Sequence, residues 1–190
     1  LADVFLDKEA AAAIVHDPRV VLNTRDVIAA KGGQAVQSRT GHAFVKQVMR
    51  KHKAVYGGEM SAHHYFRDFS YCDSGMIPWL LICELMGRTG KPLSALLAER
   101  MQKFPSSGEH NFKIADPAKA ISAVVDAYKE DALIEDRSDG VSLEFNDWRF
   151  NLRSSNTEPV VRLNIESRND THLVNEKFKE ISTILDQFAC

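Results

Sequence analysis

The sequence predicts two domains, an α/β domain over residues 1–105 and an α+β domain over residues 106–190. Three observations support this division. Short apolar runs alternate with helical patterns in the first half, period-2 runs dominate the second half, and turn-forming residues lie between them over residues 104–110. A chain of 190 residues is long enough for two small domains, each with its own core.

Strands and helices alternate at the start of the first domain, which is typical of an α/β layer. We expect strands at residues 13–15, 35–36, 54–56 and 64–66. Asn23 or Thr24 is expected to cap a short helix that ends at Gly32-Gly33. Thr40 is expected to cap a second helix, with Phe44, Val45, Val48 and Met49 on one face.

Two more helices complete the first domain. The run from Met76 to Met86 is apolar on most sides, so we expect a buried helix that Asp73 or Ser74 caps and whose first turn tolerates Pro78. The next helix has apolar residues at i, i+3, i+4 spacing between residues 93 and 104.

The second domain begins with Asp116-Pro117, an N-cap followed by proline at the first helical position. Three period-2 strands follow, at residues 141–145, 148–152 and 161–165, and an amphipathic helix spans residues 173–188. We expect an antiparallel sheet with one outward polar face, bearing Arg162, Asn164 and Glu166, and two helices that cover the other face.

Charge and hydropathy exclude several classes of protein. The chain has 24 Lys and Arg against 26 Asp and Glu, a net charge of −2, which argues against nucleic-acid or anionic-membrane partners. No apolar run reaches the roughly 18 residues that span a bilayer. The start Leu1-Ala2-Asp3 is unlike a signal peptide. The three cysteines show no CxxC spacing, which is typical of a protein in a reducing compartment. We therefore expect a cytoplasmic protein, cut from a longer chain.

The segment Arg153-Ser154-Ser155-Asn156-Thr157-Glu158-Pro159 lies between two expected strands. It gathers a guanidinium, three hydroxyls and a carboxamide, and its backbone N–H groups are free to form an anion-binding turn. These groups are typical of a phosphate site. Hairpin loops contain the same residue types without any ligand, so composition alone leaves both interpretations open.

The segment Gly57-Gly58-Glu59-Met60-Ser61-Ala62-His63-His64 is the second candidate loop. Two glycines permit an unusual backbone path, and Glu59 and Ser61 can point the same way from an extended segment. A carboxylate that accepts from two vicinal hydroxyls can hold a sugar ring. A turn that leads into an edge strand explains the same residues.

Histidines offer a third interpretation, a metal site. His42, His63, His64 and His110, with Cys72 and Asp73, could supply ligands, but none shows an HExxH or paired-thiol spacing. His42 lies in the first turn of its expected helix and is equally compatible with a hydrogen-bonding role or a plain surface position. The prediction is that this chain holds no metal.

Three segments together resemble a known family. Residues 40–46 (TGHAFVK), 58–63 (GEMSAH) and 153–159 (RSSNTEP) resemble, in this order and at similar separations, the last two domains of bacterial phosphomannomutases of the α-D-phosphohexomutase superfamily. The likeness extends across nearly all of the chain. It implies that domain three is α/β and that domain four is a TATA-box-binding-protein-like α+β domain.

The resemblance implies an activity, the interconversion of mannose 6-phosphate and mannose 1-phosphate through a phosphoserine and a bisphosphorylated sugar. It implies that His63 is catalytic and lies beside the reacting oxygens. The implied substrate-binding residues are Glu59 and Ser61 for the sugar hydroxyls and His42, Arg153, Ser155, Asn156 and Thr157 for the phosphate that is not transferred.

Two motifs that the family uses do not occur in this chain. The phosphoserine loop and the Asp-Gly-Asp loop that holds Mg²⁺ are both absent, so we expect Mg²⁺ ligands and the remaining domains outside it. Leu22 stands where many relatives have Lys, and Ala62 where Gly is commoner. The main hypothesis is an inactive substrate-binding fragment of an enzyme that supplies mannose 1-phosphate for GDP-mannose. The alternatives are a stand-alone sugar-phosphate-binding module and a metal-dependent hydrolase built on His42, His63 and His64.

Overall fold

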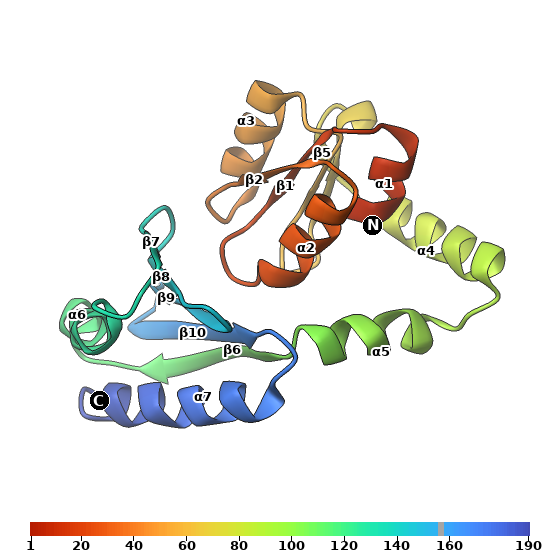
Figure 1. Cartoon of the computed structure of the whole chain (residues 1–190). Coiled ribbons are helices and arrows are strands. Elements are labelled where there is room, and N and C mark those ends of the chain that lie inside the picture. Colours follow the sequence, from red (N-terminus) through yellow and green to blue (C-terminus); the bar gives the residue numbers. More distant parts are fainter. Residues whose placement is uncertain (156–157) are drawn as a thin grey trace. The chain divides into compact units, whose positions relative to one another are not determined.

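The structure, a computed structural model, describes residues 1–155 and 158–190. Two compact units divide the chain, Leu1–Arg100 and Met101–Cys190 (Figure 1). Both units combine helices with a five-stranded sheet. Among the described residues, each helix is too short or too polar to cross a bilayer.

The first unit is built on a mixed sheet with strand order β2-β1-β3-β4-β5. Three strands are parallel: β1 (Ala13–His16), β2 (Gln34–Gln37) and β3 (Tyr56–Gly58). The short strands β4 (His64–Phe66) and β5 (Cys72–Asp73) extend this sheet in antiparallel fashion, with the 3₁₀ turn η1 (Arg67–Phe69) between them. The parallel part places three loops at one edge of the sheet, two that lead to helices α2 and α3 and one that leads to β4.

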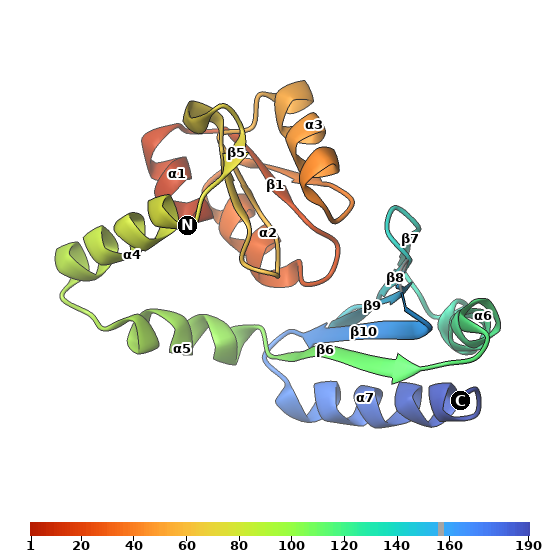
Figure 2. The ribbon, with the colours of Figure 1, turned by 180° about the vertical axis from the view of Figure 1, so that it is seen from behind.

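Helices cover both faces of this sheet, because successive apolar side chains of β1 point to opposite faces and both faces must be buried. Ile14 packs with Leu6 of α1 (Ala2–Lys8) and Ile28 of α2 (Leu22–Ala30). Val15, on the opposite face, packs with apolar residues of α3 (His42–His52). Figure 2 shows α1 and α2 on the side of the sheet opposite α3. The predicted α/β class is confirmed.

The helices α4 (Met76–Thr89) and α5 (Leu93–Lys103) form at the predicted positions, but α4 is not buried. Pro78 is its one buried residue, whereas Met76, Trp79 and Leu80 are each more than half exposed. Only one side of the helix, through Ile77 and Leu81, packs against the core of the first unit. The apolar composition of α4 predicted a buried helix, but among the described residues most of its surface has nothing packed against it.

The second unit is an antiparallel sheet with strand order β6-β10-β9-β8-β7, which confirms the α+β class. Its strands are β6 (Ser106–Lys113), β7 (Ile134–Asp136), β8 (Val141–Glu144), β9 (Trp148–Ser154) and β10 (Val160–Ser167). The helices α6 (Pro117–Tyr128) and α7 (Thr171–Asp186) pack with the sheet around one apolar core. Asp116 caps α6 as predicted, because its side chain accepts from the backbone N–H of Lys119.

The other sheet face is polar but not outward, which corrects the prediction for Asn164 and Glu166. Both are fully buried, and Glu166 forms an ion pair of 2.9 Å with the equally buried Arg149 of β9. Asn164 donates to the carbonyl of Gly108. Glu166 thus has a charged partner and Asn164 a backbone partner inside the unit, and neither side chain faces water.

Several local boundaries also differ from the sequence prediction. Asn23 and Thr24 lie inside α2, whose N-cap is Val21, and α3 begins after Gly41 without a side-chain cap, so Thr40 does not cap it. Gly57 and Gly58 belong to β3 instead of a loop. Residues 106–113 form β6 where turn chemistry was expected, because the hydrogen bonds of β10 hold this segment extended.

Candidate functional site

The loops that follow β1, β2 and β3 meet at one edge of the first sheet, because the carboxyl ends of parallel strands lie together. The loop after β1 contains Asp17 and Arg19, the loop after β2 leads through Gly41 into α3, and the loop after β3 begins with Glu59. The predicted substrate-binding residues Glu59 and Ser61 therefore lie on the loop after β3 at this edge, together with His63, and His42 is the first residue of α3, directly after the loop that follows β2. We call residues 59–63 the sugar loop, after the role that the resemblance predicts for Glu59 and Ser61.

A buried ion pair anchors the sugar loop from the side of β1. Arg19 and Asp17 are 5% and 2% exposed, and the carboxylate accepts from Nε and Nη2 of Arg19. The same carboxylate accepts from the backbone N–H of Met60 at 2.8 Å. Because a buried charge is costly unless it is paired, this arrangement fixes both the arginine and the loop.

Glu59 is buried and its carboxylate is held by three elements. Oε1 accepts from the hydroxyl of Tyr65 at 2.5 Å, and Oε2 accepts from the backbone N–H of Gly41 at 3.2 Å. Arg19 lies 3.5 Å from Oε2. Burial and the Glu59 carboxylate both raise the pKa of Tyr65, so its hydroxyl remains a donor at neutral pH.

Ser61 is exposed, and its Oγ lies 3.1 Å from Nη2 of Arg19, which donates to it. One guanidinium thus contacts Asp17, Glu59 and Ser61. Sequence reasoning missed Arg19 and Asp17. The signal that could have found them is a charged pair two residues apart directly after a buried strand, at the edge where loops of α/β folds bind ligands.

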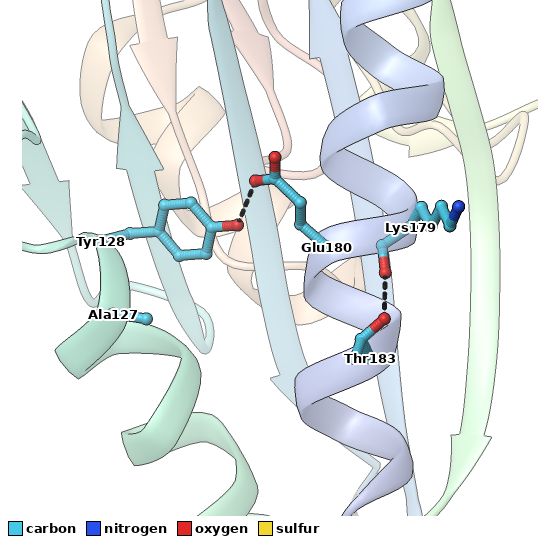
Figure 3. Close-up of a pocket in the computed structure, with 5 residues that line it drawn as sticks. All are labelled: Ala127, Tyr128, Lys179, Glu180 and Thr183. Carbon is cyan, nitrogen blue, oxygen red and sulfur yellow. Dashed lines mark hydrogen bonds between the residues drawn. The ribbon is translucent and has the colours of Figure 1, made fainter.

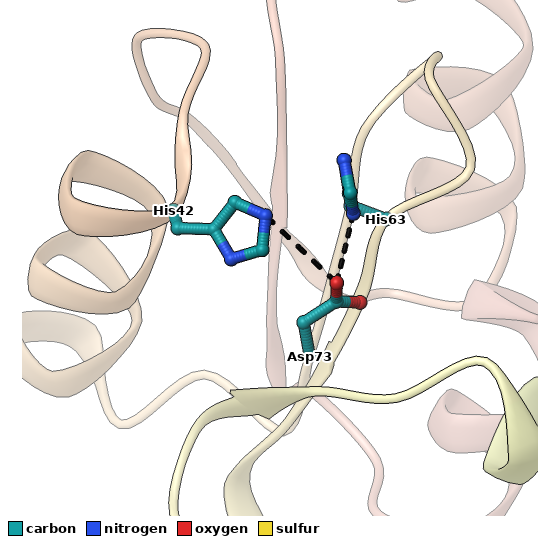
Figure 4. A group of neighbouring side chains, drawn as sticks. All are labelled: His42, His63 and Asp73. Atoms are coloured by element: carbon teal, nitrogen blue, oxygen red, sulfur yellow. Dashed lines mark hydrogen bonds and ion pairs between the residues drawn. The ribbon is translucent and has the colours of Figure 1, made fainter.

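His42, His63 and Asp73 form a cluster at the same edge (Figure 4). The two imidazole rings are 4.5 Å apart between centroids and meet edge to face. Nδ1 of His63 lies 2.8 Å from Oδ2 of Asp73, and Nε2 of His42 lies 3.8 Å from the same oxygen. His42 also meets the ring of Tyr65 edge to face. Asp73 entered the prediction as a metal candidate and as a possible cap of α4, but the N-cap of α4 is Gly75, without a side-chain cap.

The other metal candidates lie in different surroundings. His64 pairs with the hydroxyl of Tyr56 at 2.7 Å, and burial lowers the pKa of its imidazole, with help from the N-terminal ammonium and His63 and against Asp73. His110 belongs to the second unit and contacts the carbonyl of Ser107. The Sγ of Cys72 points to a backbone carbonyl. The proposed grouping of His42 and His63 with His64 does not form.

Mg²⁺ does not fit the His42–His63–Asp73 cluster. Mg²⁺ takes oxygen ligands in octahedral geometry, whereas this cluster offers two imidazole nitrogens and one carboxylate. Within the described ranges no other group of three candidate ligand side chains comes together.

In the second unit, Arg153 is the penultimate residue of β9 and its side chain is 12% exposed. Nη2 donates to Oε2 of Glu109 on β6 at 3.0 Å, and Nε has no hydrogen-bond partner among the described residues. Gly140 lies directly against it: a Cβ at Gly140 would be 2.5 Å from Cβ of Arg153. The close approach of the Gly140 backbone and the carboxylate of Glu109 thus hold Arg153 in position.

The rest of the predicted phosphate loop is described only in part. The backbone N–H of Ser155 donates to the carbonyl of Val160 at 2.9 Å and so closes the turn between β9 and β10. Asn156 and Thr157 lie outside the described residues. Glu158, after the turn, lies 3.7 Å from Arg162.

A shallow groove of about 560 Å³ lies elsewhere, between α6 and α7 (Figure 3). Tyr128, Glu180 and Thr183 line it, and the Tyr128 hydroxyl donates to Glu180 at 2.8 Å. The groove contains none of the predicted site residues. Its carboxylate would repel a phosphate, so we assign the site to the loops and not to this groove.

Comparison with known proteins identifies the family. Residues 1–104 match the model of phosphoglucomutase/phosphomannomutase, alpha/beta/alpha domain III, and residues 109–184 match that of its C-terminal domain. The chain belongs to the phosphoglucomutase/phosphomannomutase family. The predicted resemblance is confirmed.

Individual relatives agree with this assignment. The chain is 57% identical to a phosphomannomutase of Escherichia coli K12 over 98% of its own length and 41% of the relative's, and 52% identical to a protein named phosphohexose mutases in Xanthomonas campestris. It thus spans about two fifths of the length of these curated relatives.

Among solved structures, a phosphoglucomutase/phosphomannomutase family protein from Burkholderia thailandensis superposes with a TM-score of 0.80 at 29% identity, over all of this chain and 41% of that one. A putative phosphomannomutase from Thermus thermophilus, at 18% identity and a TM-score of 0.71 over 98% of this chain and 40% of that one, shares the fold. The chain therefore corresponds to the last two of the family's domains.

Proposed function

We propose that this chain is the substrate-binding part of a cytoplasmic phosphomannomutase that interconverts mannose 6-phosphate and mannose 1-phosphate and serves GDP-mannose synthesis. The phosphoserine and the Mg²⁺ ligands would lie on domains outside these 190 residues. The chain alone would bind hexose phosphates without turning them over. Sequence identity to named phosphomannomutases supports the choice of mannose phosphates.

In this proposal the sugar loop recognises the hexose. The Glu59 carboxylate accepts hydrogen bonds from sugar hydroxyls, and Ser61, already a hydrogen-bond acceptor for Arg19, donates its own hydroxyl proton. Both groups are held before any substrate arrives, so little conformational entropy is lost on binding. Such positioning orients the ring for reaction.

The phosphate that is not transferred would be bound by Arg153, Ser155, Asn156 and Thr157, with His42 as a further ligand. A guanidinium offers a planar set of donors, and hydroxyl and amide groups complete the shell around an anion. Contacts far from the reacting bond use binding energy to lower the transition-state barrier.

The chemical step transfers a phosphoryl group from phosphoserine to a sugar hydroxyl. The sugar oxygen forms a bond to phosphorus, the serine oxygen leaves, and the hydroxyl proton passes to a base. The second half-reaction returns the other phosphoryl group to serine in the same way. His63 is the base in this proposal, because its partly exposed imidazole lies on the sugar loop.

One observation carries the proposal: Glu59, Ser61 and His63 on the loop after β3 and His42 at the start of α3 meet at the carboxyl edge of the parallel strands, where α/β folds bind their ligands. A purely structural role for these segments would not need an exposed hydroxyl, an exposed imidazole and a second, partly exposed imidazole near a buried, hydrogen-bonded carboxylate.

The phosphate contact is tested by titrating the chain with mannose 1-phosphate in a calorimeter. Arg153→Ala should weaken binding by roughly 10- to 150-fold, since a charge-assisted hydrogen bond contributes about 1.5–3 kcal/mol. Arg168→Ala, which removes an exposed arginine of the same unit, is the control and should bind like the wild type. Equal affinities for all three proteins would exclude Arg153 from the phosphate site.

The sugar contact is tested in the whole mutase. Glu59→Gln keeps the shape of the side chain but replaces one acceptor oxygen with a donor amide, so turnover should fall by about 10²-fold while the protein stays folded. Circular dichroism and the melting temperature check the fold. A variant that melts earlier yet retains full turnover would show that Glu59 is structural only.

A further inference from the structure

His63 and Asp73 form a hydrogen-bonded pair whose two ring nitrogens face different surroundings (Figure 4). Nδ1 of His63 lies 2.8 Å from Oδ2 of Asp73, while Nε2 points away from the carboxylate. His42 approaches the same oxygen only to 3.8 Å, beyond hydrogen-bond distance. Asp73 therefore pairs with one of the two histidines.

The charge of Asp73 decides which nitrogen of His63 carries the proton. Burial raises the pKa of Asp73, but the His64 backbone N–H and the His63 and His42 imidazoles lower it more, so it lies below its usual value and the carboxylate is ionised at neutral pH. An ionised carboxylate only accepts hydrogen bonds. Nδ1 of His63 must therefore donate, and the neutral ring keeps a lone pair on Nε2.

The backbone of the sheet fixes the carboxylate itself. Oδ1 of Asp73 accepts from the backbone N–H of His64 at 2.9 Å, and Asp73 is paired with Tyr65 in the β4–β5 ladder. One oxygen is thus committed to the sheet and the other to His63. The edge-to-face contact with His42 restricts the His63 ring from its other side.

We propose that Asp73 is a positioning residue that holds His63 as the Nδ1–H tautomer, so that Nε2 can take the proton of a sugar hydroxyl. This role rests on the proposed function, in which His63 is the base. The proton leaves the sugar oxygen for Nε2, and Asp73 stabilises the resulting imidazolium. When the step runs in reverse, the same nitrogen returns the proton.

The two bonds of Asp73 make the effect of an amide at this position predictable. In Asp73→Asn, the His64 backbone N–H still requires an acceptor, so the amide oxygen stays there. The amide NH₂ then faces Nδ1 of His63 and donates to it. The imidazole must carry its proton on Nε2, where it can no longer act as a base.

The tautomer is read directly from the imidazole ¹⁵N and ¹H resonances of the 190-residue chain at about pH 8.5, where imidazoles are neutral. Wild-type His63 should be mainly Nδ1–H and Asp73→Asn mainly Nε2–H. Asp68→Asn, an exposed aspartate in the same segment, should match the wild type. A wild-type ring that is mainly Nε2–H overturns the proposal without any variant, as does an unchanged tautomer in a folded Asp73→Asn.

Kinetics of the whole mutase give the second readout. Asp73→Asn should lower kcat by about 10²- to 10⁴-fold and change KM by no more than about threefold, because the substrate contacts remain. Adding Asp73→Asn to His63→Gln should cost nothing further. Full kcat in Asp73→Asn overturns the positioning role.

The two readouts separate this inference from the proposed function. If the wild-type enzyme shows no mutase activity, the proposed function fails while the tautomer result still decides what Asp73 does to His63. If the enzyme is active and the tautomer does not respond to Asp73→Asn, only the positioning role fails.

Discussion

The sugar loop and the segment around Arg153 are built in different ways. In the first unit, the buried charges of Asp17, Arg19 and Glu59 hold the sugar loop from beneath. In the second unit, Arg153 has one ion pair, to Glu109, and is placed by the close backbone approach of Gly140. Buried charges hold the sugar loop in place, whereas close packing against the Gly140 backbone holds Arg153 in place.

The ligands proposed for the two regions would give this difference a chemical reason. Neutral sugar hydroxyls are held by groups that must already point in the right direction, and buried ion pairs are expensive but rigid supports for such groups. A phosphate is attracted over a longer distance by its charge, so its arginine needs less support. The two regions should therefore respond differently to substitution.

Arg19→Met should produce the largest loss of stability. It leaves the Asp17 and Glu59 carboxylates, each 2% exposed, without their cation, and loss of one partner of a buried ion pair costs about 3–5 kcal/mol. The measurement is urea unfolding followed through the amide resonances of β1. Arg67→Met is the control: its pair with the half-exposed Glu9 should contribute no more than about 1 kcal/mol. If both variants lose a similar free energy of unfolding, buried charges do not hold the sugar loop in the way that distinguishes it from the Arg153 segment.

Gly140→Ala should have the next largest effect and should act on the second unit. Gly140 has φ +73°, and an added Cβ would lie 2.5 Å from the carbonyl oxygen of Leu152 as well as from Cβ of Arg153. We expect a cost of about 2 kcal/mol or more, together with weaker binding of mannose 1-phosphate.

Gly108→Ala is the matched control for Gly140→Ala. Gly108 has nearly the same φ, +75°, but no atom within 4 Å of an added Cβ. Only the backbone penalty of about 1–2 kcal/mol remains, and binding should not change. If both variants bind mannose 1-phosphate equally well, the shape of the Gly140 contact does not position Arg153.

The smallest predicted effect is a pH dependence that belongs to the first unit. Burial lowers the pKa of His64 in the folded state below the value of about 6.5 in the unfolded chain. The unfolded chain therefore binds the proton first as the pH falls. The contribution of His64 to the free energy of unfolding is complete above about pH 6.5 and decreases below it, by at most about 1.4 kcal/mol per pH unit.

His64→Asn tests this pH dependence, because asparagine keeps a hydrogen-bonding group for Tyr56 but does not titrate. Urea unfolding at pH 7.5 and pH 5.5 should show a smaller loss of stability on acidification in the variant than in the wild type. The exposed His172→Asn should lose as much as the wild type. An identical loss in all three proteins contradicts the assignment to His64.

Much of the fold follows from periodicity in the sequence. The runs around Ile14, Ala35 and Tyr65 predicted strands, and the stripes of α3, α6 and α7 predicted helices, because burial of one face imposes a repeat on the sequence. β6 escaped prediction because Ser106-Ser107-Gly108 has turn composition, while its extended form depends on pairing with β10, more than 50 residues later in the chain. Distant hydrogen bonds of this kind leave no local pattern.

The residues with recognisable chemistry were predictable from the sequence, whereas the residues that hold them in place were less so. Glu59, Ser61 and His63 lie on the loop after β3 and His42 starts α3, all at one sheet edge, while their roles remain predictions. Arg19 and Asp73 act through contacts with residues 42 and 10 positions away. Their side chains are ordinary in the sequence, and only the three-dimensional arrangement shows what they hold.

The carboxylate of Glu59 finally sets a limit on what this loop can recognise. A carboxylate has about four lone-pair positions, and Tyr65 and Gly41 fill two of them. Two are left for the hydroxyls of the proposed hexose, and Arg19, 3.5 Å from Oε2, lies close to this carboxylate. In the proposed function, Glu59 can therefore accept from two sugar hydroxyls at most, and its preference among hexoses would depend on where that pair of hydroxyls sits around the ring.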